Sequence, residues 1–296
     1  MSTRPSFALS VLRLCRIGTW FSPAADVLAS SAIVGIAFGA PVVQAMLASM
    51  LIYGAGMVWN DIADQKEDAR QRPERPLPSG AVSLAVAIGL GTLLLGGGLL
   101  LSPCIAYHGW IAGLVLFYDF VAKRSAVLSA LTMGTLRGLN LGIGFALLTA
   151  LAPLTSPELA SERHALLVAS LCYGVYIVAV TFLGMFEDSK TVTGRAVATV
   201  QSAPPLLALA GIGVVQGGFW PATAIAALPA LWFLRRNSRM KEWPQGEIRR
   251  SMMFLLLGTM LYTALLAFAA GRPIEAAAIA AAILPARWIA RRIALT

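Results

Sequence analysis

The sequence predicts an all-α protein, a polytopic bundle of transmembrane helices. Three observations carry this prediction: 58% of the 296 residues are hydrophobic, only 12% are charged, and the mean hydropathy is +0.75. A soluble globular protein carries about 25% charged residues. The composition therefore excludes a soluble enzyme, a disordered chain and a coiled coil. The long apolar stretches predict several membrane spans within a single domain that covers residues 1–296.

The predicted spans follow one another along the whole chain. A helix needs about 20 mostly apolar residues to cross the roughly 30 Å hydrocarbon core of a bilayer. Stretches of this kind predict nine core spans and a tenth, C-terminal span, which is Ala-rich and contains Pro285 and Arg287. In chain order they lie near residues 17–39, 42–60, 81–101, 104–122, 126–150, 165–186, 196–216, 219–235, 251–270 and 273–290.

The net charge of +9 follows this predicted topology. With ten spans, nearly all of the 23 Lys and Arg residues fall on the side that holds the N-terminus, whereas Arg163 and Arg272 fall on the other side. Cytoplasmic loops of membrane proteins carry an excess of Lys and Arg. We therefore expect an integral multi-pass protein of the cell or inner membrane, with a cytoplasmic N-terminus. Because the basic residues follow the topology, nucleic acid is excluded as a partner.

Acidic residues crowd the loop after the second span. Asp61, Asp64 and Asp68 stand at i, i+3 and i+7, so a helix that continues from the span places their carboxylates on one face. Carboxylates that repel one another are unfavourable unless a cation offsets them, and an all-oxygen cluster suits Mg²⁺. Arg70 and Arg75 follow directly, and arginines next to a metal are typical of a diphosphate site. The alternative is a solvated loop that caps a membrane helix.

Two segments of the chain resemble motifs of the UbiA superfamily of intramembrane prenyltransferases. The stretch from Asn60 to Gly80 resembles the first aspartate-rich motif of that family, NDxxDxxxD, followed by its basic run ending in RPLPSG. The stretch from Tyr118 to Arg124 resembles the YxxxxKR element of the family. Both segments fall in loops on the predicted cytoplasmic side, and the resemblance covers roughly spans one to nine in order.

A third loop departs from the family pattern. Glu187 and Asp188 lie between spans six and seven, where the family carries a second aspartate-rich motif, but the usual DxxxD spacing is missing. The resemblance therefore implies that a second magnesium ion is held less securely or by fewer carboxylates, and Lys190 and Arg195 are expected to take over part of the neutralisation of charge. Together with the opening segment around Arg16 and Asp26 and the tenth span, this departure resembles a less characterised, EboC-like branch of the superfamily.

The resemblance implies that an isoprenoid chain moves from a prenyl diphosphate to an acceptor within the membrane, with Mg²⁺ as the cofactor. The acceptor, aromatic or otherwise small and lipophilic, and the oligomeric state are not identified by the sequence. The implied metal ligands are Asn60, Asp61, Asp64, Asp68, Glu187 and Asp188. The implied diphosphate contacts are Arg70, Arg75, Lys123, Arg124 and Lys190. The implied catalytic residues are Asp61, Asp64, Asp68, Tyr118, Lys123 and Asp188.

The sequence leaves other functions, and other roles for some of these residues, open. A membrane-embedded terpene cyclase would ionise the same diphosphate without an acceptor, and a transporter would use the intramembrane charges Asp26 and Arg137 as a substrate path. A structural link between Asp26 and Arg137 is an equally good account of that pair. Asp119 and Lys123 stand at i, i+4, which favours a simple helical ion pair. His108 is expected near the opposite membrane face, away from the acidic loop.

Overall fold

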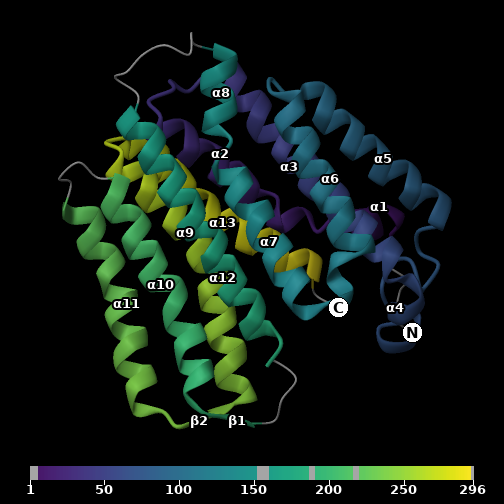
Figure 1. The fold of residues 1–296 in the computed structure, drawn as a ribbon. Coiled ribbons are helices and arrows are strands. Elements are labelled where there is room, and N and C mark those ends of the chain that lie inside the picture. Colours follow the sequence, from purple (N-terminus) through teal and green to yellow (C-terminus); the bar gives the residue numbers. More distant parts are fainter. Residues whose placement is uncertain (1–5, 152–159, 187–190, 216–219, 295–296) are drawn as a thin grey trace.

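The apolar stretches form long helices that lie beside one another (Figure 1). The structure, a computed structural model, describes residues 6–151, 160–186, 191–215 and 220–294. The helices of the N-terminal half are α1 (Phe7–Leu14), η1 (Ile17–Thr19), α2 (Phe21–Ile33), α3 (Ala40–Ala63), α4 (Gln65–Gln71), α5 (Leu84–Leu101), α6 (Ile105–Phe120), η2 (Ala122–Arg124), α7 (Ala126–Leu141) and α8 (Gly144–Leu151). Those of the C-terminal half are α9 (Ala160–Gly184), α10 (Arg195–Val215), α11 (Trp220–Arg239), α12 (Gln245–Ala269) and α13 (Pro273–Ala294).

The predicted membrane fold is confirmed, with differences at two predicted spans. Among the described residues, eight helices are long and apolar enough to cross a membrane, with α7 and α8 counted together. The first predicted span, 17–39, is instead broken: η1 precedes α2, and α2 has 13 residues and is followed by Gly35 in the left-handed region at φ 72°. The predicted span 219–235 is α11, whose basic C-terminal turns lower its hydropathy. The number of crossings therefore stays a prediction.

One short strand pair was not expected from the hydropathy pattern. β1 (Thr191–Thr193) pairs antiparallel with β2 (Glu242–Pro244), and Val192 lies opposite Trp243. β-Branched and aromatic residues favour strands, and Trp243 is fully buried beneath the guanidinium of Arg236, 5.4 Å from its ring centre. The strand pair ties the loop before α10 to the loop before α12 at one end of the bundle (Figure 1).

Close helix contact in the centre of the bundle depends on glycine. At the crossing of α7 and α9, a Cβ atom added to Gly134 would lie 2.5 Å from the carbonyl oxygen of Gly174. Small residues at such crossings let helix backbones approach, which favours association within a membrane. The tight crossing fixes α7, which carries Arg137 and Asn140, against α9 with Tyr173.

The two ends of the described chain meet beside the acidic loop. The backbone of Ala290 on α13 lies so close to Gly18 that an added Cβ atom would be 2.7 Å from it. Arg13 donates a hydrogen bond from Nε to the carbonyl oxygen of Ile293 at 3.0 Å, which satisfies one carbonyl at the end of α13. The tenth predicted helix thus packs against the N-terminal segment (Figure 1).

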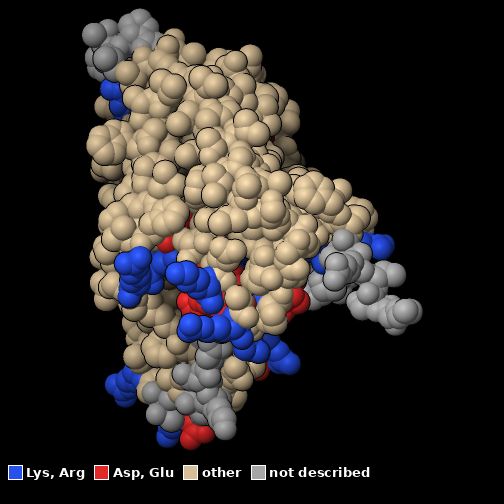
Figure 2. Space-filling view, turned by 90° about the vertical axis from the view of Figure 1, so that its right-hand side faces the viewer, with Lys and Arg blue, Asp and Glu red and all other residues tan. Residues whose placement is uncertain are grey.

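The charged side chains are unevenly distributed over the surface. In the face drawn in Figure 2, Lys and Arg gather in the lower half of the molecule, whereas the upper part is almost entirely uncharged. Acidic side chains lie among the basic ones. A broad uncharged surface next to a charged end is what a protein embedded in a bilayer requires.

Candidate active site

The acidic loop continues from α3 with a break at one residue. Helix α3 ends at Ala63, and α4 begins at Gln65, so Asp64 joins the two helices at φ −92° and ψ 0°. The prediction of a helix that continues from the span is therefore wrong at Asp64, whereas Asp61 and Asp68 still lie on the same side, where both contact Arg75. Asp61 and Asp68 are both buried, at 5% exposed each, and Asp64 lies between them. Buried carboxylates need partners, and each of these has one.

Three basic side chains from different parts of the chain hold the acidic residues. Arg75 lies 2.6 Å from Asp68 and 3.8 Å from Asp61, and Lys123 lies 2.5 Å from Asp64. Arg16 completes the set at 3.0 Å from Asp61. These pairs bring the end of α3, the RPLPSG loop, η2 and the N-terminal segment together. Two motifs far apart in the sequence, the aspartate-rich loop and the YxxxxKR element, therefore form one cluster.

Lys123 does not form the ion pair that its spacing predicted. Its Nζ lies 2.5 Å from Asp64 and 3.5 Å from the carbonyl oxygen of Asn60, whereas Asp119 has no ion pair within the described chain. The interpretation of Asp119 and Lys123 as a helical pair is therefore wrong. η2 breaks the helix after Phe120, so the i, i+4 geometry of a regular helix is lost there.

The remaining predicted residues divide into three groups. Asn60 and Tyr118 lie close to the cluster and line a cavity described below. Arg70 and Arg124 are exposed on the surface and do not contact the acidic side chains in this arrangement. The third group consists of Glu187, Asp188 and Lys190, which lie outside the described residues.

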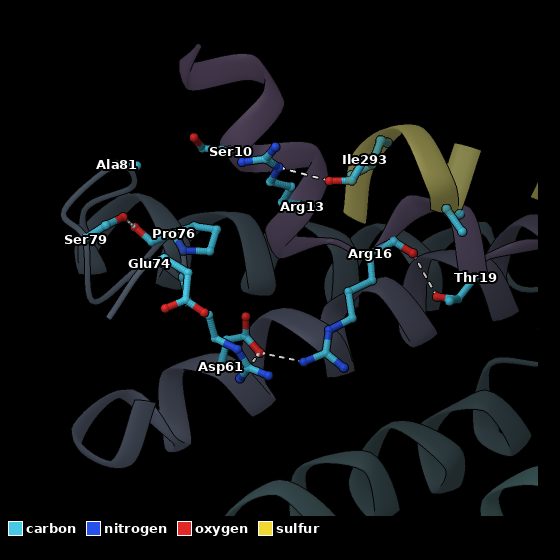
Figure 3. A pocket seen from close by; sticks show the side chains of 13 residues that line it. Ser10, Arg13, Arg16, Thr19, Asp61, Glu74, Pro76, Ser79, Ala81 and Ile293 are labelled. Carbon is cyan, nitrogen blue, oxygen red and sulfur yellow. Dashed lines mark hydrogen bonds and ion pairs between the residues drawn. The ribbon is translucent and has the colours of Figure 1, made fainter. Parts of the chain in front are cut away.

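An outer cavity of about 340 Å³ opens beside Asp61 (Figure 3). Arg13, Arg16 and Arg75 supply basic groups to its lining, and Asp61 and Glu74 supply acidic ones. Its walls come from the N-terminal segment, the RPLPSG loop and the end of α13. Arginines that converge on a polar cavity are typical of sites for phosphate groups.

An inner cavity of about 170 Å³ lies within the helix bundle on the other side of Arg16. One face of α3, from Ser49 to Asn60, forms its long wall, and Ile52 and Met57 make part of that wall apolar. Polar groups from three other elements complete the lining: Arg16, Tyr118, Asp119, Arg137 and Asn140. Arg16 lines both cavities and therefore stands at their junction.

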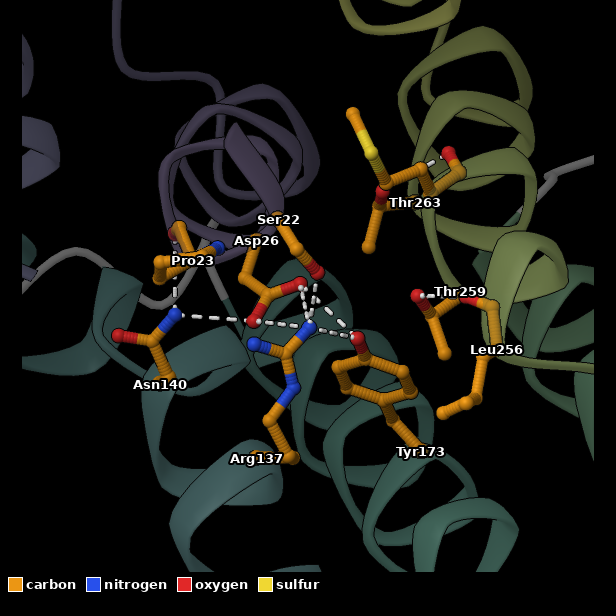
Figure 4. A network of polar contacts seen from close by, with 10 residues as sticks. Ser22, Pro23, Asp26, Arg137, Asn140, Tyr173, Leu256, Thr259 and Thr263 are labelled. Carbon is orange, nitrogen blue, oxygen red and sulfur yellow. Dashed lines mark hydrogen bonds and ion pairs between the residues drawn. The ribbon is translucent and has the colours of Figure 1, made fainter. Parts of the chain in front are cut away.

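A buried polar network borders the inner cavity (Figure 4). Asp26 on α2 is 1% exposed and lies 3.2 Å from the guanidinium of Arg137, with Asn140 donating to the same carboxylate at 2.9 Å. Tyr173 and Ser22 also contact Arg137. The structural link between Asp26 and Arg137, one of the two accounts left open by the sequence, is therefore present. Arg137 and Asn140 also line the inner cavity, so the same network shapes one of its walls.

Arg16 belongs to the candidate site, although neither the aspartate-rich motif nor the YxxxxKR element contains it. Among the described residues it is the one non-glycine residue with positive φ, at φ 48° and ψ 46°. The left-handed region is unfavourable for a residue with a long side chain, and such strain clusters at functional sites. The sequence does not predict this conformation, because it shows only that Arg16 is an arginine just before the predicted span 17–39.

Replacing Arg16 with glycine should separate its side chain from its backbone. Glycine adopts positive φ without strain, so we expect thermal stability to be unchanged or slightly higher. Loss of a charge-assisted contact should lower kcat/KM for a prenyl diphosphate about 10- to 100-fold, mainly through a higher KM. Steady-state kinetics and thermal unfolding in detergent measure both effects. Arg72→Gly, at an exposed position of the acidic loop, is the control, and equal kinetics for the two variants would contradict the assignment.

His108 lies in a polar chain within the bundle. It is fully buried and contacts Ser49 at 3.0 Å through Nε2 and Ser102 at 2.6 Å through Nδ1. It is about 11 residues of α6 away from Asp119, or roughly 16 Å along a helix. That His108 does not act with the acidic loop stays a prediction. Burial raises the pKa of the Cys15 thiol to about 11, which keeps that cysteine unreactive.

The oxygen donors of the cluster suit Mg²⁺. Carboxylates and amide oxygens are the ligands that this ion prefers, and Asn60, Asp61, Asp64 and Asp68 provide them from adjacent turns. Within the described part of the chain, no three acidic, histidine or cysteine side chains are gathered closely enough to hold a metal ion. Each of the three carboxylates of the cluster instead forms an ion pair with a basic side chain. The donor chemistry fits a magnesium diphosphate, and the predicted second set of ligands lies outside the described residues.

Curated proteins are similar in sequence to parts of this chain. A digeranylgeranylglyceryl phosphate synthase from Metallosphaera sedula is 34% identical over 107 residues, which is 34% of this chain and 38% of that protein. The protein of the same name from Methanoculleus marisnigri is 25% identical over 174 residues, or 55% of this chain and 56% of that one. The chain thus spans 38% of the length of the first of these relatives and 56% of the length of the second.

Solved structures show the same fold. One, described as giving insights into digeranylgeranylglyceryl phosphate synthase in membranes, has a TM-score of 0.64 at 18% identity and covers 90% of this chain and 99% of its own. The apo structure of a UbiA homolog from Aeropyrum pernix K1 has a TM-score of 0.61 at 19% identity and covers 89% and 96%. The narrower resemblance to the EboC-like branch stays a prediction. A family model matches residues 20–258, from the start of α2 to the middle of α12, and on this match the chain belongs to the UbiA prenyltransferase family.

Proposed function

We propose that this protein transfers an isoprenoid chain from a prenyl diphosphate to an acceptor within the membrane, with Mg²⁺ as cofactor. The observation that carries this proposal is the cluster of Asp61, Asp64 and Asp68, held by basic side chains at the junction of two cavities. The names of the curated relatives describe a product with geranylgeranyl groups on a glyceryl phosphate. They support a glyceryl phosphate lipid as the acceptor.

The basic residues of the cluster would bind the leaving group. Breaking the bond between C1 of the donor and the diphosphate oxygen places negative charge on the diphosphate, so cationic groups there lower the barrier most. Mg²⁺ bound by Asn60 and the three aspartates would add positive charge at this position. Arg75 and Lys123 form ion pairs with these aspartates and would bind the diphosphate oxygens when the donor is present. In the same proposal Asp188, Glu187 and Lys190 complete the site.

The surroundings of the cluster would protect the reactive carbon from water. The inner cavity is apolar along Ile52, Ile111 and Leu136, and the isoprenoid chain would extend from there between helices toward the lipid. Tyr118 lines the same cavity and offers its ring to a developing carbocation. The charge distribution supports a cytoplasmic position for this end of the bundle.

Incubation of the purified protein with prenyl diphosphates of different lengths, Mg²⁺ and candidate acceptors tests the proposal. We expect mass analysis of the lipids to show a prenylated acceptor and the release of diphosphate, both lost when the metal is chelated. A free hydrocarbon or alcohol without an adduct would instead indicate a terpene cyclase. Intact donors of every length would overturn the proposal.

A further inference from the structure

We propose that the hydroxyl end of the acceptor enters the inner cavity beside C1 of the donor, that this hydroxyl is neutral, and that Asp119 accepts its proton during transfer. The inference deepens the proposed function and rests on it, because it names the class of acceptor and the group that receives the proton.

Asp119 is buried without a partner at the edge of the inner cavity. Its side chain is 2% exposed, and its Oδ2 atom has no hydrogen-bond partner. A buried carboxylate without a partner is expensive, and such a conflict between local and global structure is expected at functional sites. Asp119 lines the inner cavity, so a group that enters the cavity can reach it. The unpaired oxygen is therefore available to accept a hydrogen bond from a ligand.

The charges that line the inner cavity favour a neutral ligand. Arg137 is neutralised by Asp26, and Arg16 by Asp61, through ion pairs at 3.2 Å and 3.0 Å. Asp119 therefore contributes the one carboxylate without a direct partner among the described residues of the lining. An anionic group in this cavity would be repelled by that carboxylate, whereas a hydroxyl can donate a hydrogen bond to it.

The other polar groups of the cavity suit a hydroxyl as well. Asn140 uses its amide nitrogen for Asp26 and for the carbonyl oxygen of Pro23, and in Figure 4 its amide oxygen points away from both. Arg137 concentrates its contacts on one nitrogen, Nη2. The wall made by these two residues is polar but has no net charge once Asp26 is included. Any anionic part of the acceptor would lie outside, where Arg13 and Arg75 line the outer cavity.

The transfer step balances with these groups. The bond between C1 and the diphosphate oxygen breaks, and its electron pair leaves with the diphosphate. The hydroxyl oxygen of the acceptor forms the new bond to C1, and its proton passes to the carboxylate of Asp119. Arg16, Lys123, Asp61 and Asp64 are the charged groups around Asp119, and the first two limit the repulsion between the three carboxylates.

Asp119→Asn keeps the size of the side chain and removes the proton acceptor. We expect adduct formation to fall at least about 100-fold, the usual contribution of a general base. Ionisation of the donor should continue, measured as exchange of a labelled bridging oxygen into the non-bridging positions of the diphosphate. Thermal stability should be equal or higher, because an uncompensated buried charge is removed.

The control is Glu162→Gln on α9. Glu162 also has a buried carboxylate oxygen without a partner, but it lines neither cavity, so adduct formation should be unchanged. Wild-type rates of adduct formation in Asp119→Asn would overturn the inference, as would the loss of both exchange and transfer. Absence of exchange and transfer in the wild-type protein would instead count against the proposed function.

A matched pair of compounds tests the class of ligand directly. Benzyl alcohol and benzoate differ in the group that would enter the inner cavity, a neutral hydroxymethyl group or a carboxylate. We expect the alcohol to inhibit transfer at a lower concentration than benzoate in the wild-type protein, and the difference to be smaller in Asp119→Asn. Stronger inhibition by benzoate in the wild-type protein would overturn the assignment of a neutral hydroxyl site.

Discussion

Asp64→Ala should abolish magnesium-dependent release of diphosphate from a prenyl diphosphate. Asp64 lies at the break between α3 and α4 with Lys123 at 2.5 Å, so the change removes one proposed ligand and releases the lysine from its position. Loss of one preorganised electrostatic group costs about 100- to 1,000-fold in turnover. Diphosphate release measured over a range of Mg²⁺ concentrations should show this loss together with a higher requirement for the metal.

Glu67→Ala is the matched control for this prediction. Glu67 lies in α4 three residues after Asp64, is exposed, and contacts Gln71 of the same helix at 2.9 Å. Substitutions at such surface positions change stability by less than about 0.5 kcal/mol. We therefore expect normal turnover and a normal metal requirement in Glu67→Ala. If Asp64→Ala behaves in the same way, the aspartate-rich loop does not bind the metal, and the mechanism proposed for the leaving group is wrong.

The sequence could predict the fold class and the cluster because both depend on local patterns. Long apolar stretches require helices in a bilayer, since every backbone polar group must be satisfied within the segment. The spacing of Asp61, Asp64 and Asp68 and the element that ends in Arg124 are short motifs, and the structure places Asp64 and Lys123 2.5 Å apart. Their meeting follows from the topology, because both motifs lie where membrane helices end at the same end of the bundle.

The sequence could not predict features that depend on contacts between distant segments. The break after Phe120 turns Lys123 toward Asp64 and leaves Asp119 unpaired, although their spacing in a regular helix favours a pair. The left-handed backbone of Arg16 is imposed by its surroundings, and propensity alone would disfavour it. The pairing of β1 with β2 joins segments about 50 residues apart in sequence, which no local pattern of three residues can indicate.

Breaking the ion pair between Asp26 and Arg137 should be the most destabilising change in the centre of the protein. Asp26 is 1% exposed and Arg137 is 9% exposed, and removal of one partner leaves the other as a buried charge. Such a loss costs about 3–5 kcal/mol. Asp26→Leu should therefore lower the unfolding temperature in detergent strongly, and Tyr173→Phe, which removes one hydrogen bond to each partner, should cost about 1 kcal/mol.

The double variant Asp26→Leu/Arg137→Met separates stability from function at this pair. Replacing both charges with apolar side chains of similar size is often neutral, so the double variant should recover most of the stability lost by Asp26→Leu. The wall of the inner cavity would nevertheless lose its polar groups, because Arg137 lines that cavity. If the network only holds α2 against α7, the stable double variant will transfer prenyl groups normally. If it also positions the acceptor, as the geometry indicates, the double variant will ionise the donor but show a higher KM for the acceptor.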